Sequence, residues 1–112
     1  MQLEIQKYLF DIKCSIDSIY DYLGEKRDFN EYVSNKLLRR GVERELEIIG
    51  EAVHKILKID SGIAIDNKRK IINLRNLVIH GYDKVDDVII WGIVSKHLPI
   101  LKTQVEMLLM EE

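Results

Sequence analysis

Four side chains that could do chemistry stand close together in the segment LRNLVIHGYDKVD, residues 74–86: Arg75, Asn76, His80 and Tyr82. A histidine titrates near neutral pH and can act as a general base or a general acid. An arginine can donate two charge-assisted hydrogen bonds to a phosphate. RNA carries its own nucleophile, the 2′-hydroxyl, so its cleavage needs a proton acceptor, a proton donor and positive charge on the phosphate. These residue types therefore fit RNA phosphodiester cleavage.

The spacing of these residues limits how they can cooperate. Asn76 and His80 are four residues apart and share one face of a helix. Arg75 and His80 are five apart, which turns them about 140° from one another on an ideal helix. Three arrangements would still unite them: the arginine reaches round the helix, the helix end distorts near Gly81, or two copies of the protein combine their residues across an interface.

A purely structural interpretation competes with the catalytic one. Arg75 could pair with Glu47 or Glu51, and a histidine near a helix C-terminus interacts favourably with the helix dipole without any catalytic role. Basic residues crowd the segment and could attract phosphate, although such runs are also typical of solvated helix faces. Two clusters stand out, Lys68, Arg69, Lys70, Arg75 and Lys84 in the first and Arg39, Arg40 and Arg44 in the second.

Composition indicates one folded helical domain that spans residues 1–112. Apolar residues make up 46 % of the chain and charged residues 32 %, which is typical of a globular protein and not of a disordered one. One proline and six glycines favour long helices over a turn-rich sheet. The net charge of −2 excludes a strongly basic nucleic-acid coat protein.

Cysteine usage and hydropathy bear on the compartment. The single cysteine, Cys14, cannot form an intrachain disulfide, and we expect it to be a small buried side chain on a helix. With no signal peptide at the N-terminus, this predicts a cytoplasmic protein. The longest apolar run, VIIWGIV at residues 88–94, is far shorter than the roughly 20 residues that a membrane span needs, so no membrane association is expected.

The first half of the chain predicts two amphipathic helices. Apolar residues recur every three or four positions over residues 3–23, and Gly24 follows where a C-terminal cap would lie. A second, longer helix is expected to begin at Asn30 or Asp28 and to run to about residue 58. It contains Gly41 and Gly50, which predict close approach by a neighbouring backbone.

The second half predicts a loop over residues 59–66 and further helices that complete an antiparallel four- to five-helix bundle. Asp66 is expected to cap a third helix that carries the polar segment and ends near Gly81. A fourth helix should begin near Asp86 or Asp87, and Pro99 predicts a break or kink at about His97 before the last helix.

Several signatures of other chemistry are absent from the sequence. The chain has no glycine-rich phosphate loop, no Cys-x-x-Cys pair and no His-Glu-x-x-His sequence. His54, His80 and His97 show no spacing typical of metal ligands. We therefore expect neither a bound metal nor a cofactor.

The polar segment also carries a resemblance to a known family. Arg, four residues, His, any residue and Tyr is the hallmark of HepT-type proteins of the HEPN superfamily, and it stands intact as Arg75, His80 and Tyr82. Further segments resemble the family in the same order: YLFDIKCSIDSIYDYL, VERELEIIGEAV and VDDVIIWGIVSKHLPILK. Two features depart from the family pattern: residues 59–66 lack a stretch with proline and tryptophan, and His97 stands where an acidic residue is common.

The resemblance implies a fold and an activity. Such proteins are all-helical homodimers whose motifs meet in a cleft at the dimer interface, and active members are metal-independent endoribonuclease toxins of a type VII-like toxin–antitoxin system. Arg75 and His80 would be catalytic, with Asn76 in support, and RNA would be the substrate. The antitoxin resembles a minimal nucleotidyltransferase of the MntA type, which would attach AMP to Tyr82. The alternative is a catalytically weak helical module that binds such a nucleotidyltransferase.

Two structural expectations follow from the motif. Leu74, Leu77 and Val78 should face the bundle core while the polar side chains face the cleft. Both His80 side chains of a dimer should then lie near its two-fold axis.

Overall fold

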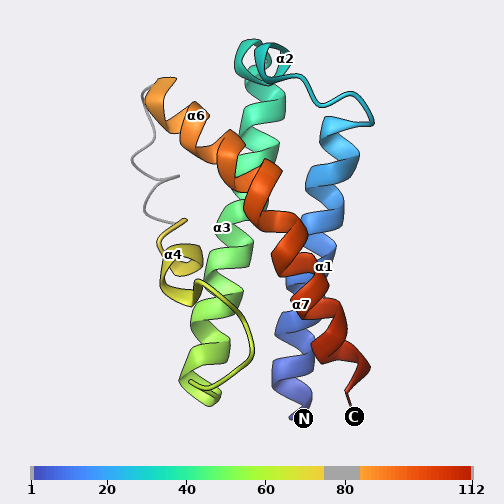
Figure 1. Ribbon diagram of the computed structural model, residues 1–112, viewed down its shortest axis with the longest axis vertical. Coiled ribbons are helices and arrows are strands. Elements are labelled where there is room, and N and C mark those ends of the chain that lie inside the picture. The colour runs from blue at the N-terminus through green and yellow to red at the C-terminus, as the bar shows by residue number, and fades with distance from the viewer. Residues whose placement is uncertain (1, 75–83, 112) are drawn as a thin grey trace.

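The computed structural model describes residues 2–74 and 84–111, with side chains described for 2–74 and 87–111 (Figure 1). Helices make up nearly all of this part of the chain, and none of it forms a β-strand, which confirms the prediction of an all-α bundle. The elements, in chain order, are α1 (Leu3–Leu23), α2 (Phe29–Ser34), α3 (Lys36–Ile59), α4 (Lys68–Ile72), α6 (Lys84–Gly92), the π-helical turn η1 (Ile93–His97) and α7 (Leu98–Met110).

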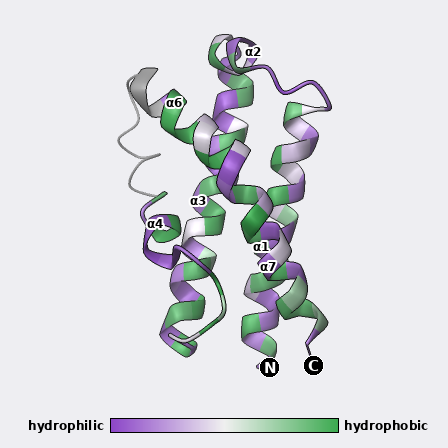
Figure 2. Cartoon of the chain, viewed as in Figure 1, coloured by the Kyte–Doolittle hydropathy of each residue, from purple (hydrophilic) through white to green (hydrophobic). Residues whose placement is uncertain are grey.

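The core lies between α1, α3 and α7. In Figure 1, α1 and α3 run in opposite directions over the length of the molecule, and α7 returns beside α1 so that both termini lie at the same end. Figure 2 shows apolar and polar residues alternating along each long helix, as an amphipathic pattern requires. The expected stripe of α1 is confirmed by its buried members, Ile5, Leu9, Ile12, Ile16 and Ile19.

The second predicted helix is wrong in one respect, because it is broken in two at Asn35. Asp28, one of the two candidate caps, accepts a hydrogen bond from the backbone N–H of Asn30 at 2.8 Å and so begins α2. The chain then becomes extended at Asn35, whose side chain accepts from the Leu38 N–H at 3.0 Å and starts α3. Asparagine side chains compete in this way with helical backbone bonds, which explains the break.

The start of the third helix also differs from the prediction. Asp66 does not cap it: the Asp66 N–H donates to the side-chain oxygen of Gln104 at 2.9 Å, which ties the loop to α7. The residue before α4 is Asn67, in a left-handed conformation with φ of 58°. The expected end near Gly81 lies outside the described residues, and α6 begins at Lys84, slightly earlier than expected.

The break predicted near His97 is confirmed as a π-helical turn. Pro99 has no N–H to donate and its ring would clash with the carbonyl of Ser95 in a regular α-helix. The wider turn over residues 93–97 removes this conflict. It also keeps Val94 and Leu98 buried on the same side, so the apolar face of α6 continues into α7.

Three smaller predictions about single residues have mixed outcomes. Cys14 is exposed, so the expectation of a buried cysteine is wrong. Gly41 does mark a close approach, but to a side chain and not to a backbone: a Cβ there would lie 3.2 Å from the Tyr22 ring. The cap at Gly24 is confirmed, since its φ is +71° and its N–H donates to the Tyr20 carbonyl.

Candidate functional site

The polar segment that the sequence singled out lies mostly outside the described residues. Arg75, Asn76, His80 and Tyr82 all fall within residues 75–83, and so do Leu77 and Val78. The residue before it, Leu74, is 5 % exposed and belongs to the core, as predicted. The structure therefore describes the two helices that flank the segment in the chain, α4 before it and α6 after it.

A groove of about 610 Å³ lies beside α4, between it and the continuous stretch of α6, η1 and α7. Most of its lining is apolar, and the polar side chains that also line it include Lys70, His97 and Gln104. The apolar lining residues are Ile71, Leu74, Ile89, Ile93, Leu98, Ile100 and Leu101. Ile89 and Ile100 are 44 % and 51 % exposed, so the groove borders an apolar surface that the monomer leaves open to solvent.

The first basic cluster is partly committed to the fold. Lys68 donates to the Ile63 carbonyl at 2.8 Å and so braces the loop before α4. Arg69 and Lys70 are exposed and form no ion pair with any described residue. Arg69 and Lys70 stand six and five residues before Arg75, so two positive charges lie in the chain just before the motif.

The second basic cluster is partly paired within the fold. Arg40 lies 3.3 Å from Glu43, and Arg44 lies 4.0 Å from Glu47, each one helical turn further along α3. Arg39 donates to the Val33 carbonyl and so links α3 to α2. The structure thus gives Arg39 a structural role, and Arg40 and Arg44 form ion pairs at the surface, where their side chains are 65 % and 70 % exposed. The predicted alternative, an ion pair of Arg75 with Glu47 or Glu51, stays a prediction because Arg75 lies outside the described residues.

Two buried polar side chains, Glu43 and Tyr32, were not predicted from the sequence. Glu43 is only 8 % exposed, and burial raises the pKa of its carboxyl above the ordinary value. Tyr32 is fully buried, burial raises the pKa of its phenol, and its ring lies 5.3 Å from that of Trp91. One signal was available in the sequence: Glu43 precedes Leu46 and Gly50 at helical spacing, which places it at the edge of the apolar stripe of α3.

The described part of the chain has neither a candidate metal site nor a membrane-spanning helix. No group of three or more histidine, cysteine, aspartate or glutamate side chains within residues 2–74 and 84–111 could hold a metal ion. Over those ranges, no helix is both long and apolar enough to cross a bilayer. His54 is half-buried on α3, and His97 is exposed and lines the groove.

Comparisons with known proteins place the chain in a family. A family model described as Ribonuclease HepT-like matches residues 12–108. A Methanocaldococcus jannaschii protein named "Putative RNase" is 33 % identical over 105 residues, which cover 92 % of this chain and 94 % of the relative. A Thermococcus cleftensis protein named "Probable ribonuclease HepT" is 31 % identical over 109 residues, 96 % of this chain and 98 % of the relative. No solved structure matches. The chain therefore belongs to the HepT-like ribonuclease family.

Proposed function

We propose that this protein is a metal-independent endoribonuclease toxin in which Arg75 binds the scissile phosphate and His80 transfers a proton. The observation that carries the proposal is an intact Arg75–His80–Tyr82 motif in a chain whose family match runs through it. Asn76, four residues before His80, supports the site by holding the histidine or the phosphate. The exposed cations Arg69 and Lys70, just before the motif, add attraction for the RNA backbone.

The reaction needs only groups that the motif and the substrate supply. The 2′-oxygen of the RNA attacks the adjacent phosphorus as its proton is removed, and the bond from phosphorus to the 5′-oxygen breaks as that oxygen gains a proton. The products are a 2′,3′-cyclic phosphate and a 5′-hydroxyl. Histidine suits either proton transfer because its pKa lies near neutrality, and the guanidinium of Arg75 stabilises the extra negative charge on the phosphorane.

A cleavage assay tests this function directly. Purified protein is incubated with RNA in the presence of a metal chelator, and the ends of the fragments are analysed. We expect cleavage by the wild type, a loss of about 10²- to 10⁴-fold in His80→Ala, and no loss in the control His54→Ala. RNA that stays intact with the wild type, with Tyr82 shown by mass to be unmodified, would refute the nuclease. Equal and negligible toxicity of wild type and His80→Ala on expression would favour the alternative, a helical module that binds a nucleotidyltransferase.

We further propose that the active form is a homodimer that uses the apolar surface of α6 and α7. Val88, Ile89 and Ile100 are 59 %, 44 % and 51 % exposed, and the last two line the groove beside α4. Burial of such side chains stabilises an association by about 25 cal/mol for each Å² of apolar surface. A symmetric contact here would bring together the two stretches of chain that follow Leu74, which answers the 140° separation of Arg75 and His80.

The dimer is tested by light scattering with matched variants. We expect a dimer at micromolar concentration for the wild type, a monomer with little cleavage activity for Ile100→Glu, and a dimer for Leu37→Glu. Leu37 is a fitting control because it is 84 % exposed at the start of α3, away from the groove residues. A monomeric wild type at this concentration would contradict the proposal.

The proposed regulation depends on Tyr82. AMP attached there by an MntA-like nucleotidyltransferase would place a phosphate near Arg75 and His80, occupy the cationic site and obstruct RNA by its volume. We expect Tyr82→Phe to retain cleavage but to escape silencing when the partner enzyme and ATP are present. Intact-mass analysis and a growth assay measure the two effects. A Tyr82→Phe protein that is still modified and still silenced would show that this tyrosine is not the switch.

A further inference from the structure

The groove beside α4 has the size and the lining of a site for a small organic ligand. Its volume of about 610 Å³ falls within the range of about 300–1,000 Å³ that is typical of ligand pockets. Such pockets combine an apolar lining with a few polar groups that fix the orientation of the ligand. Here three buried leucines, Leu74, Leu98 and Leu101, line the groove together with two asparagines, Asn67 and Asn73. A flat apolar group with hydrogen-bonding edges suits both kinds of side chain.

The two asparagines carry amides that the fold does not use. Asn67 stands at the start of α4 in a left-handed conformation with φ of 58°, which asparagine tolerates. An asparagine at the start of a helix commonly caps it, but the side chain of Asn67 makes no capping hydrogen bond. Asn73, at the end of α4, donates its backbone N–H to the carbonyls of Arg69 and Ile71 and leaves its side chain free of such a role. Both asparagines are exposed, so their amides can donate to and accept from a ligand in the groove.

Two side chains that can bind a phosphate line the same groove from different elements. Lys70 belongs to α4, and His97 belongs to the π-helical turn η1. Both are exposed, and neither forms an ion pair with any described residue. A lysine binds phosphate as a point charge, and an imidazole N–H donates a hydrogen bond to it. Asp66 is the carboxylate among the described lining residues, so donors to phosphate outnumber it. A π-helical turn, moreover, is frequently found at a functional site.

We propose that this groove is a nucleotide subsite of the nuclease, which holds one unpaired base of the RNA. The base lies against the leucines, the amides of Asn67 and Asn73 bond its edge, and Lys70 and His97 bind the adjoining phosphate. Proteins read RNA in this way where it is single-stranded, because an unpaired base can leave the stack and present its hydrogen-bonding edges.

The place of the groove in the chain connects this subsite with the motif. Leu74 lines the groove and is the residue before Arg75. A nucleotide in the groove therefore neighbours the proposed phosphate ligand, and the enzyme prefers single-stranded RNA and selects the base next to the cleaved bond. The choice of ligand rests on the proposed function. Ile89 and Ile100, the exposed apolar residues of the lining, remain part of the proposed dimer contact.

Titration of the wild type with the four nucleoside 3′-monophosphates, followed by NMR of the backbone amides, tests the subsite. We expect saturable shifts at the groove residues of α4, η1 and α7, and weaker binding of ribose 5-phosphate and of inorganic phosphate, which have no base. Asn67→Gly deletes the amide, and glycine accepts the left-handed backbone. It should weaken nucleotide binding about 2- to 12-fold, the effect of one lost hydrogen bond. Asn30→Ala, which removes an exposed amide of α2 away from the groove residues, should bind like the wild type.

RNA cleavage gives a second readout. Asn67→Gly should change the ratios of kcat/KM among substrates that differ in the base next to the cleaved bond, and should keep the pH profile of the wild type. Unchanged ratios would overturn the proposal, and so would equal affinity for nucleotides and ribose 5-phosphate.

The remaining outcomes separate this inference from the other proposals. A wild type that binds no nucleotide, while a monomeric Val88→Glu variant does, would show that a second copy covers the groove, and would overturn the subsite. Val88 suits this comparison because it is 59 % exposed and does not line the groove. Cleavage of RNA without nucleotide binding in the groove would refute the subsite alone. Nucleotide binding in the groove of a protein that cleaves no RNA would support the subsite and refute the nuclease.

Discussion

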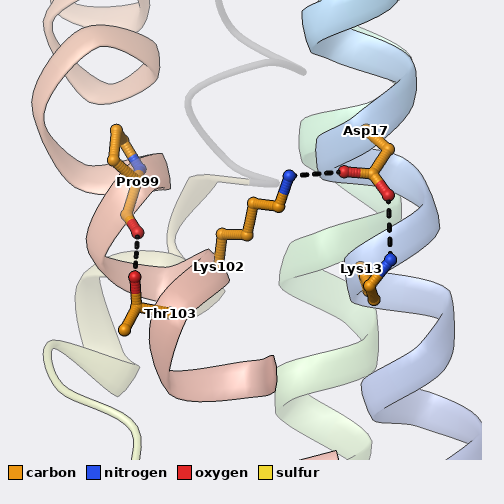
Figure 3. Close-up of polar contacts among 5 residues, drawn as sticks. All are labelled: Lys13, Asp17, Pro99, Lys102 and Thr103. Carbon is orange, nitrogen blue, oxygen red and sulfur yellow. Dashed lines mark hydrogen bonds and ion pairs between the residues drawn. The ribbon is translucent and has the colours of Figure 1, made fainter. Parts of the chain in front are cut away.

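Replacing the partners of the Asp17–Lys102 ion pair tests which forces hold α7 against α1. Lys102 of α7 donates to Asp17 of α1 at 2.9 Å, and Lys13 donates to the other carboxylate oxygen at 3.1 Å (Figure 3). The hydrogen bond from Lys102 is the largest cause that lowers the pKa of Asp17, and it raises the pKa of Lys102 in return. The pair is prominent, yet the side chains of Lys102 and Asp17 are 31 % and 40 % exposed.

The solvent exposure of Asp17 and Lys102 limits the free energy that their ion pair contributes. Solvent screens a pair that is a third or more exposed, and such pairs contribute about 0.2–1 kcal/mol, so we expect a coupling free energy of about 0.5 kcal/mol. Ile16, the neighbour of Asp17 in sequence, is fully buried. Its replacement by alanine removes buried methyl groups and leaves a cavity, at a cost of about 2–5 kcal/mol. The apolar stripe should therefore outweigh the ion pair several-fold.

Urea unfolding of matched variants measures the coupling free energy of the ion pair and the cost of the cavity at Ile16. Asp17→Asn, Lys102→Met and the double variant give the coupling, and Ile16→Ala gives the cost of the cavity. The coupling should fall in high salt. Because the folded pKa of Asp17 is lowered, its contribution is complete above the ordinary value of 3.8 and is lost as the pH falls through the folded pKa. A coupling above about 2 kcal/mol, or an Ile16→Ala variant less destabilised than Lys102→Met, would refute the reasoning.

Three further predictions concern single positions. Asn35→Ala removes the side-chain cap of α3 and should cost about 1 kcal/mol of unfolding free energy in urea, whereas Asn30→Ala, inside α2 and exposed, should cost less. Gly24→Ala should cost about 1 kcal/mol because its φ of +71° strains any other residue, while Gly62→Ala, where φ is not positive, serves as the unstrained control. Cys14 should react with a maleimide in the native protein, as its exposure requires, and a thiol that reacts only after unfolding would contradict the structure.

The helices could be predicted where apolar spacing and caps agreed. Over residues 3–23 the stripe and Gly24 gave the same answer, and the structure follows it. The break at Asn35 was missed because the apolar spacing continues across it, from Tyr32 to Val42, as if one helix were present. The break is a local event: an asparagine side chain that bonds the Leu38 N–H and a backbone that turns extended at that residue. Periodicity is insensitive to such an event.

Cys14 was predicted to be buried because of its residue type, but its position on α1 makes it exposed. Ile12 and Ile16 of α1 are fully buried, and Cys14 stands between them, two residues from each. Two residues correspond to about 200° of rotation on a helix, so a side chain midway between two buried neighbours points away from the core. The phase of the stripe was already in the sequence and was the better guide.

The charged residues show most clearly how a candidate site differs between sequence and structure. Arg40 and Arg44 looked like a second phosphate-binding patch, but each has a carboxylate three residues further along the same helix, at 3.3 and 4.0 Å. Arg69 and Lys70 have no such partner among the described residues, and they lie just before Arg75 in the chain. The described residues therefore distinguish the two clusters by pairing: Arg40 and Arg44 each have a carboxylate nearby, whereas Arg69 and Lys70 do not. For the proposed nuclease this difference matters, because phosphates held far from His80, the residue proposed to transfer the proton, would contribute to binding but not to cleavage.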